Sequence, residues 1–393
     1  MRRASADWIS RCTPRRGHRR GPRTIASDDR ATRSLGSTRK DDHIRLAAEQ
    51  RREPAARNEF DDVEFVHHAL DGIDVERIDL AAHVGDWTWP VPLYINGMTG
   101  GSDTALGVNR TLARAARVAG LPMASGSVGI AIDDPDAAAS FTVIRDENPD
   151  GFVMANIGAG RPADHGRRAV ELLGADALQL HVNAVQETVM PEGSREFSGW
   201  LRGVEATVAA AGVPVIVKEV GFGLSRRTLR RLADIGVRIA DVSGTGGTNF
   251  ARIESARGED GFAYLAAHGS SAVACLLDAP ADGPQLLASG GVRTPYDVVK
   301  ALALGARAVG VAGTFLTLAL EGDAERTAAA LERWCTELRM LHALLGAETP
   351  AALAHTDLLV RGRAREFAEL RGIDLTALTN RSQPAQRSDE ESR

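Results

Sequence analysis

Cysteine is scarce in this chain, and the few cysteines lie far apart. Among 393 residues there are three, Cys12, Cys275 and Cys335, and no two of them have the spacing of a metal-binding motif. This usage argues against a disulfide framework and is typical of proteins of the cytosol. We therefore expect a cytoplasmic protein.

Long apolar runs and an excess of positive charge are also missing. No apolar run reaches the length of a membrane span, so we expect no membrane-spanning helix. The formal net charge of −5 shows none of the basic excess that is typical of nucleic-acid-binding proteins. The hydrophobic content of 44% and the charged content of 25% are ordinary for a globular protein.

The two ends of the chain differ in composition from the rest. Residues 1–38 are rich in Arg, Ser, Gly and Pro, and we predict a disordered extension because this composition buries little apolar surface. A start codon placed too far upstream would also explain it. A transit peptide is the alternative, but no clear amphipathic helix accompanies the arginines, and no apolar stretch suits a secretory signal. Residues 376–393 are predicted to form a disordered tail.

One pattern repeats about eight times between residues 90 and 315. Short apolar runs alternate with Ala-, Leu- and Arg-rich stretches of helical period, which is the signature of βα units. The expected strands are 92–98, 122–125, 152–156, 177–182, 215–219, 239–243, 286–289 and 308–311. The expected helices are 106–119, 163–173, 198–211, 225–235 and 295–304, with Ser225 and Thr294 as caps of the last two. We predict an α/β fold, a (β/α)8 TIM barrel over residues 91–375, with a doubly wound sheet as the alternative.

The fourth expected strand ends in a group of polar residues. Alternate side chains of a strand share a face, so we expect Gln179, His181 and Asn183 to point the same way. Gln186 and Glu187 follow in the turn. Polar groups that face a barrel interior are costly unless they find partners, so this pattern predicts a site for a polar ligand. The alternative is a hydrogen-bonded core histidine.

Glycine recurs at the ends of the expected strands, where barrel enzymes carry their chemistry. At six of the eight ends it stands beside Ser, Thr, Asn or Lys, which a wrapped ligand explains better than turn geometry alone. Strands seven and eight commonly hold a phosphate, and here they end in 290–293 and 312–314, the latter leading into a helix. An FMN fits this arrangement, with its ring over the barrel mouth and Lys218 near the pyrimidine edge. The alternative for Lys218 is a snorkelling lysine or one paired with an acid such as Asp241.

The ordered set of motifs between residues 39 and 382 resembles type 2 isopentenyl-diphosphate isomerases, an FMN-dependent family. A single glycine-rich motif is shared by several flavin barrels, whereas the ordered set is specific. The motifs are RKDDH (39–43), NEFDDV (58–63), NGMTGG (96–101), HVNAVQE (181–187), VKEVG (217–221), SGTGGT (243–248) and ASGGVR (288–293).

The resemblance implies the isomerisation of isopentenyl diphosphate to dimethylallyl diphosphate in isoprenoid biosynthesis. This reaction is a 1,3-allylic proton shift without net oxidation, and reduced FMN would act as the acid/base, with N5 and N1 carrying protons. NADPH would serve only to reduce the flavin, and Mg²⁺ would bridge to the diphosphate. The resemblance also implies a homo-tetramer or homo-octamer, and a lid segment at 39–90 that folds over the barrel mouth.

Three groups of site residues follow from the resemblance. Those that would grip the substrate are Arg39, Lys40 and His43, with Gln186 near its alkene end, and Glu187 would reach the Mg²⁺. His181 and Asn183 would organise the diphosphate end and form the catalytic group together with Gln186. The residues that would hold FMN are Gly97, Met98, Thr99, Ser127, Asn156, Lys218, Ser243, Thr248, Gly291, Val292, Arg293, Ala312 and Gly313.

One departure and two rival functions accompany this interpretation. Many family members have Gln-Arg where this chain has Val128-Gly129, which leaves open the diphosphate contact of that arginine. FMN-dependent 2-hydroxy acid oxidases share the barrel but need a histidine base and an arginine after strand six, where this chain has Thr245 near the histidine position. A non-catalytic flavin- or phosphate-binding barrel is the second rival, and it would not need the Arg39-Lys40 pair, Gln186 or Glu187.

Overall fold

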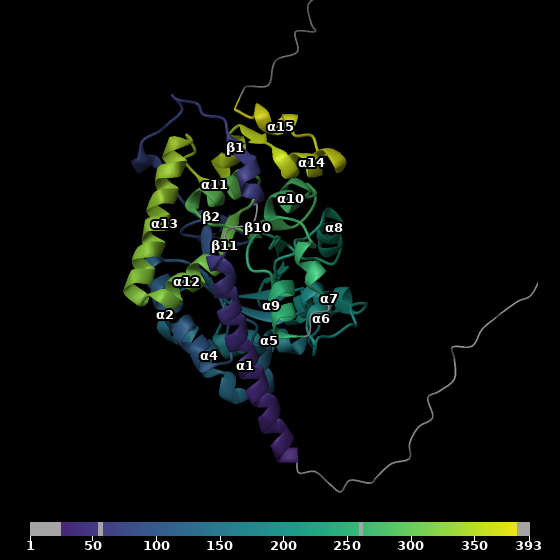
Figure 1. The fold of residues 1–393 in the computed structure, drawn as a ribbon. Coiled ribbons are helices and arrows are strands. Elements are labelled where there is room, and N and C mark those ends of the chain that lie inside the picture. The colour runs from purple at the N-terminus through teal and green to yellow at the C-terminus, as the bar shows by residue number, and fades with distance from the viewer. Residues whose placement is uncertain (1–24, 54–57, 259–261, 383–393) are drawn as a thin grey trace, which may run out of the picture.

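Eight parallel strands close into a barrel in the computed structural model of the protein, which describes residues 25–53, 58–258 and 262–382 and, for 25–37, the backbone alone (Figure 1). The last barrel strand pairs with the first, so the predicted (β/α)8 barrel is confirmed and the doubly wound alternative is wrong. In chain order the strands are β4 (Leu93–Ile95), β5 (Met123–Ala124), β6 (Val153–Gly158), β7 (Ala177–His181), β8 (Val215–Lys218), β9 (Ile239–Asp241), β10 (Gln285–Ser289) and β11 (Ala308–Val311).

Helices surround the barrel and bury their apolar faces against it (Figure 1). Between the strands lie α2 (Asp103–Ala119), α3 (Gly129–Asp133), α4 (Ala139–Glu147), α5 (Asp164–Leu173), α6 (Ala184–Val189), α7 (Trp200–Ala210), α8 (Arg226–Asp234), α9 (Phe250–Arg257), α10 (Ala272–Leu277) and α11 (Pro295–Ala303). After the last strand follow α12 (Gly313–Glu321), α13 (Ala324–Leu344), α14 (Gly362–Leu370) and α15 (Thr376–Thr379).

Local sequence signals explain where several of these helices begin. The Ser225 side chain accepts a hydrogen bond from the Thr228 amide, and Thr294 caps α11 with Pro295 in its first turn, as predicted. Ser102 caps α2 in the same way, three residues after the Thr99 turn that ends the first barrel strand. Each cap satisfies an amide that the first helical turn leaves without a partner.

Two short antiparallel ladders lie outside the barrel. Strand β1 (Val63–Phe65) pairs with β12 (Leu358–Val360), and β2 (Ala82–Val84) pairs with β3 (Trp87–Trp89). Trp89 of this hairpin is fully buried against Tyr94 of the first barrel strand, with ring centroids 5.6 Å apart. The hairpin and the interior apolar residues of the barrel form one cluster, so this end of the barrel is packed solid.

Helix α1 (Ile25–Arg52) contacts α2, α9 and α12 and crosses the face of the barrel (Figure 1). It begins inside the stretch predicted as a disordered extension, and α15 lies inside the predicted C-terminal tail. The rest of both predictions, 1–24 and 383–393, lies outside the described residues. Among the described helices, none is long and apolar enough to cross a membrane.

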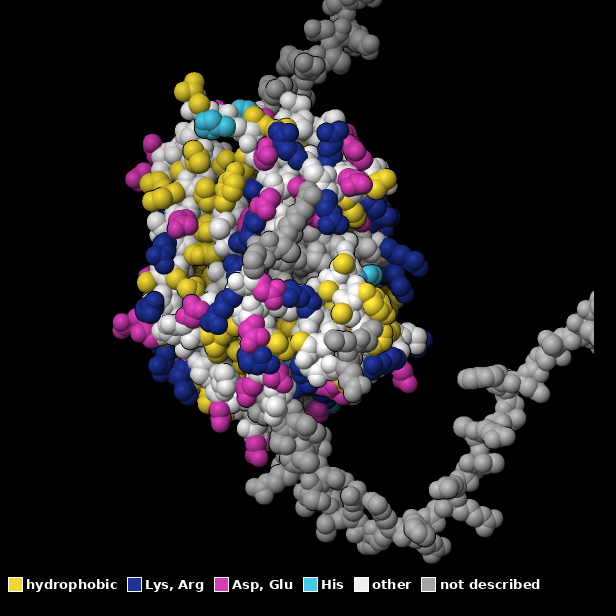
Figure 2. All heavy atoms as spheres, in the orientation of Figure 1, with side chains coloured by type: hydrophobic (Ala, Val, Ile, Leu, Met, Phe, Trp, Pro, Cys, Tyr) yellow, Lys and Arg dark blue, Asp and Glu magenta, His cyan; other side chains and the backbone are white. Residues whose placement is uncertain are grey.

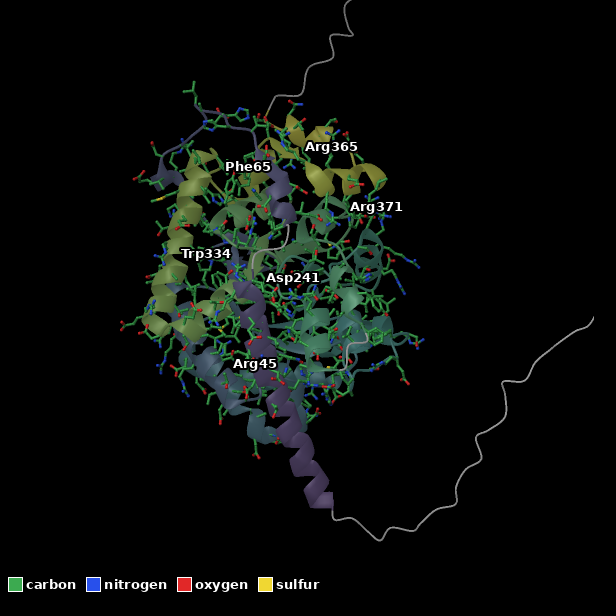
Figure 3. All side chains as sticks on the ribbon, in the orientation of Figure 1. Arg45, Phe65, Asp241, Trp334, Arg365 and Arg371 are labelled. Carbon is green, nitrogen blue, oxygen red and sulfur yellow. The ribbon has the colours of Figure 1, made fainter. Side chains whose placement is uncertain are left out.

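A buried carboxylate, Asp241, lies at the centre of the barrel (Figure 3). It accepts hydrogen bonds from the Tyr94 hydroxyl at 2.7 Å and the Ser289 hydroxyl at 2.8 Å. The Ser243 amide and the Asn96 carboxamide also donate to it, at 3.1 and 3.3 Å. Burial and the neighbouring Asp241 raise the pKa of Tyr94 well above its ordinary value, so the phenol keeps its proton and donates. Three strands, β4, β9 and β10, are therefore joined through one carboxylate.

We expect Tyr94→Phe to lower the free energy of unfolding by about 1–3 kcal/mol, because it removes a donor from a buried charge. Urea unfolding followed by circular dichroism measures this change. Tyr264→Phe is the matched control, since Tyr264 is largely exposed and should cost almost nothing. Equal stability of the two variants would contradict the role given to the Asp241 network.

Candidate active site

A cavity of about 1080 Å³ opens at the carboxyl ends of the barrel strands, beneath α1. The turns after all eight strands line it, and one face of α1 lines it with residues three or four apart. All the site residues predicted from the sequence lie on its wall, although they come from elements far apart in the chain. Outside the cavity, Lys, Arg, Asp and Glu side chains are interspersed over the surface around α1 (Figure 2).

The turn after β10 passes close to the turn after β9 and has no room for side chains. Gly290 and Gly291 have φ of 92° and 79°, and a Cβ atom at Gly290 would lie 2.0 Å from the Gly244 carbonyl oxygen. Beside this turn, Ala312 precedes α12 without any side-chain cap, so the first amides of α12 are open to a ligand. Thr248 lies 3.8 Å from the Cβ position of Gly313. This glycine-lined corner fits a phosphate.

The residues of the NEFDDV motif anchor the chain to this same corner. Lys300 donates to the Phe60 carbonyl at 2.8 Å, and the Asn58 carboxamide donates to the Gly291 carbonyl. The Arg293 guanidinium is held by Asp61 at 2.6 Å and by Asp297 at 3.0 Å. The predicted FMN ligand Arg293 therefore lies on the cavity wall with its guanidinium already paired to two carboxylates.

Lys218 lies buried at the end of β8, and its ammonium donates to the Glu219 carbonyl at 2.7 Å. Burial lowers the pKa of Lys218, while the charges of Asp241 and Glu219 act in the opposite direction. The hydrogen bonds of Asp241 come from other groups, so the alternative of a direct Lys218–Asp241 pair is not what the structure shows. Lys218 instead reaches the cavity wall, where the predicted flavin contact requires it.

Thr99 presents an unusual polar atom at the end of the first barrel strand. Its Oγ1 is buried and, within the described residues, has no hydrogen-bond partner. Buried hydroxyls are normally paired, and Thr99 lines the cavity. A ligand with a polar edge at this wall would satisfy the hydroxyl, as the predicted FMN would.

His181 lies at the end of β7 and hydrogen-bonds through Nδ1 to the Asn156 Oδ1 at 2.8 Å. A Cβ atom at Gly158 would lie 3.1 Å from its Nε2, so the glycine makes room for the ring. Burial, followed by the charges of Lys218 and Lys40, lowers the pKa of His181 to about 3. The imidazole is therefore neutral at ordinary pH, and it combines the role of a hydrogen-bonded core histidine with a place on the cavity wall.

Asn183 does not share a strand face with His181 as predicted. The strand ends at His181, and Asn183, with φ −139° and ψ 44°, takes the position before α6. From there its carboxamide donates to the Glu187 carboxylate at 3.0 Å and to Gln186 Oε1 at 3.4 Å. The chain leaves the strand earlier than alternation suggests because α6 begins at once.

A carboxylate that the sequence interpretation missed, Glu254 of α9, connects α1 to α6. Its Oε1 accepts from the Gln186 carboxamide at 3.0 Å and lies 2.9 Å from His43 Nε2, while Arg257 pairs with Oε2. Burial alone would raise the pKa of Glu254, but His43, Gln186 and Arg257 together hold it at about 2. Burial lowers the pKa of His43, so the imidazole that lies beside the ionised Glu254 is neutral.

The signal that could have revealed Glu254 is its place on the helix. It lies four residues after Phe250 and next to Ile253, on the side of α9 that packs inward, where a lone carboxylate needs a partner.

The basic end of the cavity is formed by α1. Arg39 pairs with Glu192 at 3.1 Å, and its Nε is buried without a partner among the described residues. Burial and the neighbouring Arg39 lower the pKa of Lys40 to about 8, with Glu254 acting in the opposite direction. Two cations of α1 therefore line this end of the cavity, where an anionic ligand would lower their energy.

Arg161, in the turn after β6, was also not predicted. A Cβ atom at Gly129 would lie 3.2 Å from its Nη2, so the guanidinium covers Gly129. Gly129 is the position at which the family resemblance led us to expect an arginine in many members. Arg161 pairs with Asp133 at 2.7 Å and lines the cavity. This wall thus has a guanidinium in spite of Gly129.

Glu187 lies on the cavity wall and accepts from the Ser194 amide at 2.8 Å and from Asn183 at 3.0 Å. Among the described residues, no three His, Cys, Asp or Glu side chains come together as a metal cluster. One carboxylate with oxygens from a bound phosphate is a usual set of ligands for Mg²⁺, so Glu187 fits a metal that arrives with a phosphorylated ligand.

Comparison with known proteins places the chain among flavin barrels. The sequence profile of the FMN-dependent dehydrogenase family matches residues 157–360. The isopentenyl-diphosphate delta-isomerase of Streptomyces sp. (strain CL190) is 53% identical to this chain, over 88% of this chain and 95% of its own length. The one in Latilactobacillus sakei subsp. sakei (strain 23K) is 43% identical, over 88% of this chain and 99% of its own.

Solved structures of oxidases share the fold. A mandelate oxidase is 21% identical with a TM-score of 0.57, covering 86% of this chain and 98% of that chain. A protein described as a lactate oxidase from Pediococcus acidilactici is 17% identical with a TM-score of 0.62, covering 84% and 94%. At these identities the likeness extends to the barrel fold alone.

We expect Thr99→Val to weaken FMN binding about three- to tenfold, because the hydroxyl loses a hydrogen bond to the ligand. The same change should leave the ligand-free protein equally or more stable, since it removes an unpaired buried hydroxyl. Fluorescence titration with FMN and thermal unfolding of the apoprotein measure the two effects. Ser255→Ala is the control, since Ser255 Oγ is also buried without a partner among the described residues but is outside the cavity wall. Unchanged FMN affinity of Thr99→Val would refute the assignment.

Proposed function

The chain belongs to the isopentenyl-diphosphate delta-isomerase family, and we propose that it converts isopentenyl diphosphate to dimethylallyl diphosphate with the help of reduced FMN. One observation carries the proposal. A single cavity holds both a glycine-lined phosphate corner beside Lys218 and, under α1, the cations Arg39 and Lys40 next to the Gln186–Glu254 pair. A non-catalytic flavin-binding barrel would need only the first of these two parts.

The residues present fit the flavin. The open amides of α12 and the Gly290–Gly291 turn suit its phosphate, and the unpaired Thr99 hydroxyl and buried Lys218 suit the polar edge of its ring. When bound in its reduced form, FMN supplies the acid/base chemistry of the allylic shift. The chain itself offers no strong acid at the alkene end, since Gln186 is neutral and the Glu254 carboxylate stays ionised down to about pH 2.

The substrate diphosphate would bind at the basic end of the cavity. Arg39 and Lys40 supply positive charge, and neutral His181 supplies a hydrogen-bonding ring whose Nδ1 is fixed by Asn156. Glu187 would hold Mg²⁺ together with diphosphate oxygens. A site beneath α1 would remove the Mg²⁺ and the diphosphate from water, which strengthens the attraction between them.

Gln186 is proposed to orient the alkene end. Its Nε2 donates to Glu254, and its Oε1 accepts from Asn183, so both ends of the carboxamide are fixed. An alkene is a weak base that is protonated only when it is held close to an acid in a site that excludes water. A fixed, neutral wall of this kind positions the substrate without competing for the proton.

We further propose NADPH as the reductant of the flavin, a homo-tetramer or homo-octamer, and a cytoplasmic location. The first two rest on the family resemblance, and the last on the sparse cysteine content of the chain.

Anaerobic incubation with FMN, NADPH, Mg²⁺ and isopentenyl diphosphate tests the proposed function. We expect dimethylallyl diphosphate to appear only when the flavin is reduced, and without stoichiometric consumption of NADPH. The oxidase alternative predicts peroxide from a 2-hydroxy acid in air instead. Thr245 stands in the turn after β9, where that chemistry needs a histidine, so we expect no peroxide. Peroxide formation without isomerisation would overturn the proposal.

Gln186→Ala should lower turnover on the order of 100-fold while FMN is retained, because the change removes substrate positioning and leaves the flavin corner intact. Turnover and the flavin absorbance of the purified variant measure both effects. Gln285→Ala is the control, because its side chain accepts from Gly85 at the packed end of the barrel and should affect neither. Equal loss of turnover and FMN would disprove the role of Gln186.

The pH dependence should report Lys40. Its pKa is lowered to about 8, so below pH 8 the ammonium is charged and attracts the diphosphate, and above pH 8 this attraction is lost. We expect kcat/KM, which reports the free enzyme, to fall above about pH 8. Lys40→Arg should keep activity on this limb, because arginine remains charged. If kcat/KM of Lys40→Arg falls above pH 8 as it does in the unaltered chain, the fall must be assigned to another group.

A further inference from the structure

Arg51, in the last turn of α1, is a cation without a carboxylate partner. Its Nη2 donates to the Thr314 hydroxyl at 3.0 Å, and within the described residues no acid lies within ion-pair distance of it. The next residue, Arg52, points elsewhere and pairs with Glu321 at 3.1 Å. Burial and the nearby positive charge of Arg293 lower the pKa of Arg51, while the charge of Asp297 acts in the opposite direction. The surroundings of Arg51 therefore favour an anion.

The place that Arg51 reaches is the phosphate corner of the cavity. Thr314 is the second residue of α12, the helix whose first turn has no side-chain cap. Arg51 and Thr314 line the cavity together with Gly291, Gly313 and Thr248. The corner thus receives open amides from α12, the hydroxyls of Thr248 and Thr314, and a guanidinium from a different part of the chain.

Helix α1 connects this corner to the substrate end. Arg51 is twelve residues after Arg39, and at 1.5 Å per residue the two lie about 18 Å apart along the helix axis. Arg39, Lys40 and His43 face the proposed diphosphate site, and Arg51 faces the phosphate corner. One rigid helix is therefore in contact with both ends of the cavity.

We propose that Arg51 binds the phosphate of FMN, so that the cofactor itself holds the lid helix in place over the substrate site. The proposal rests on the FMN binding proposed above. The proposal adds a phosphate ligand from α1 to the FMN site. It also makes the position of α1 depend on the phosphate, because riboflavin, which has the same ring but no phosphate, would leave α1 without this contact.

Titration of the apoprotein with FMN and with riboflavin tests the proposal. Arg51→Gln should weaken FMN binding about tenfold or more, which is the usual effect of losing one charge-assisted contact, and should change riboflavin binding less than about twofold. Arg51→Lys should give an intermediate loss, because the charge remains but the planar guanidinium does not. Arg52→Gln is the matched control, and both flavins should bind it as they bind the unaltered chain.

Three outcomes would overturn the assignment. Equal weakening of FMN and riboflavin by Arg51→Gln would show a structural effect on α1, and unchanged FMN affinity would show that no phosphate contact exists. Equal affinity of the unaltered chain for the two flavins would also exclude it. The measurement is independent of turnover, so a failure of isomerase activity with FMN binding intact would refute the proposed reaction and leave the role of Arg51 standing.

Discussion

Closure of eight parallel strands is the constraint on which the site depends. Once β11 pairs with β4, the carboxyl ends of all eight strands meet at one rim, and the turns that follow them have only one place to face. The buried Asp241 joins the first, sixth and seventh strands from inside, with Tyr94, Asn96, Ser243 and Ser289 as donors. The opposite end is packed by Trp89 and its neighbours, and within the described residues the cavity lies at the carboxyl ends of the strands, beneath α1.

The cavity wall holds buried charges and unpaired polar atoms, which cost free energy in the absence of a ligand. Lys218 is buried with a single carbonyl partner, the Thr99 hydroxyl and the Arg39 Nε have none among the described residues, and Lys40 has its pKa lowered to about 8. Lys218 of β8 and Thr99 after β4 belong to the proposed flavin side of the cavity, and Arg39 and Lys40 of α1 belong to the proposed anion side. Bound cofactor and substrate would supply the missing partners.

The fold could be predicted from the sequence because its signals are local. Apolar runs gave the strands, and Ser225 and Thr294 gave helix starts that the structure confirms. The predicted site residues were also brought together on one wall, because the motifs at strand ends must meet once the barrel closes. Asn183 was placed wrongly because alternation along a strand does not show where the strand ends.

The contacts that the sequence did not show are those between distant segments. Two partners of Glu254, His43 and Gln186, lie 211 and 68 residues from it in the sequence. The periodicity of α9 does not indicate either partner. Arg161 covers Gly129, and Arg51 reaches Thr314, through the packing of elements rather than through motifs. The start of α1 at Ile25 was missed because an Arg- and Ser-rich composition argued for disorder.

The most direct test of the whole account is the reaction in D₂O with reduced FMN, followed by NMR of the product. A 1,3-allylic proton shift that exchanges with solvent predicts dimethylallyl diphosphate with deuterium in the newly formed methyl group. Product without deuterium would show that hydrogen passes directly between the two carbons. That result would contradict an acid/base mechanism in a site built to position the alkene against an external proton donor.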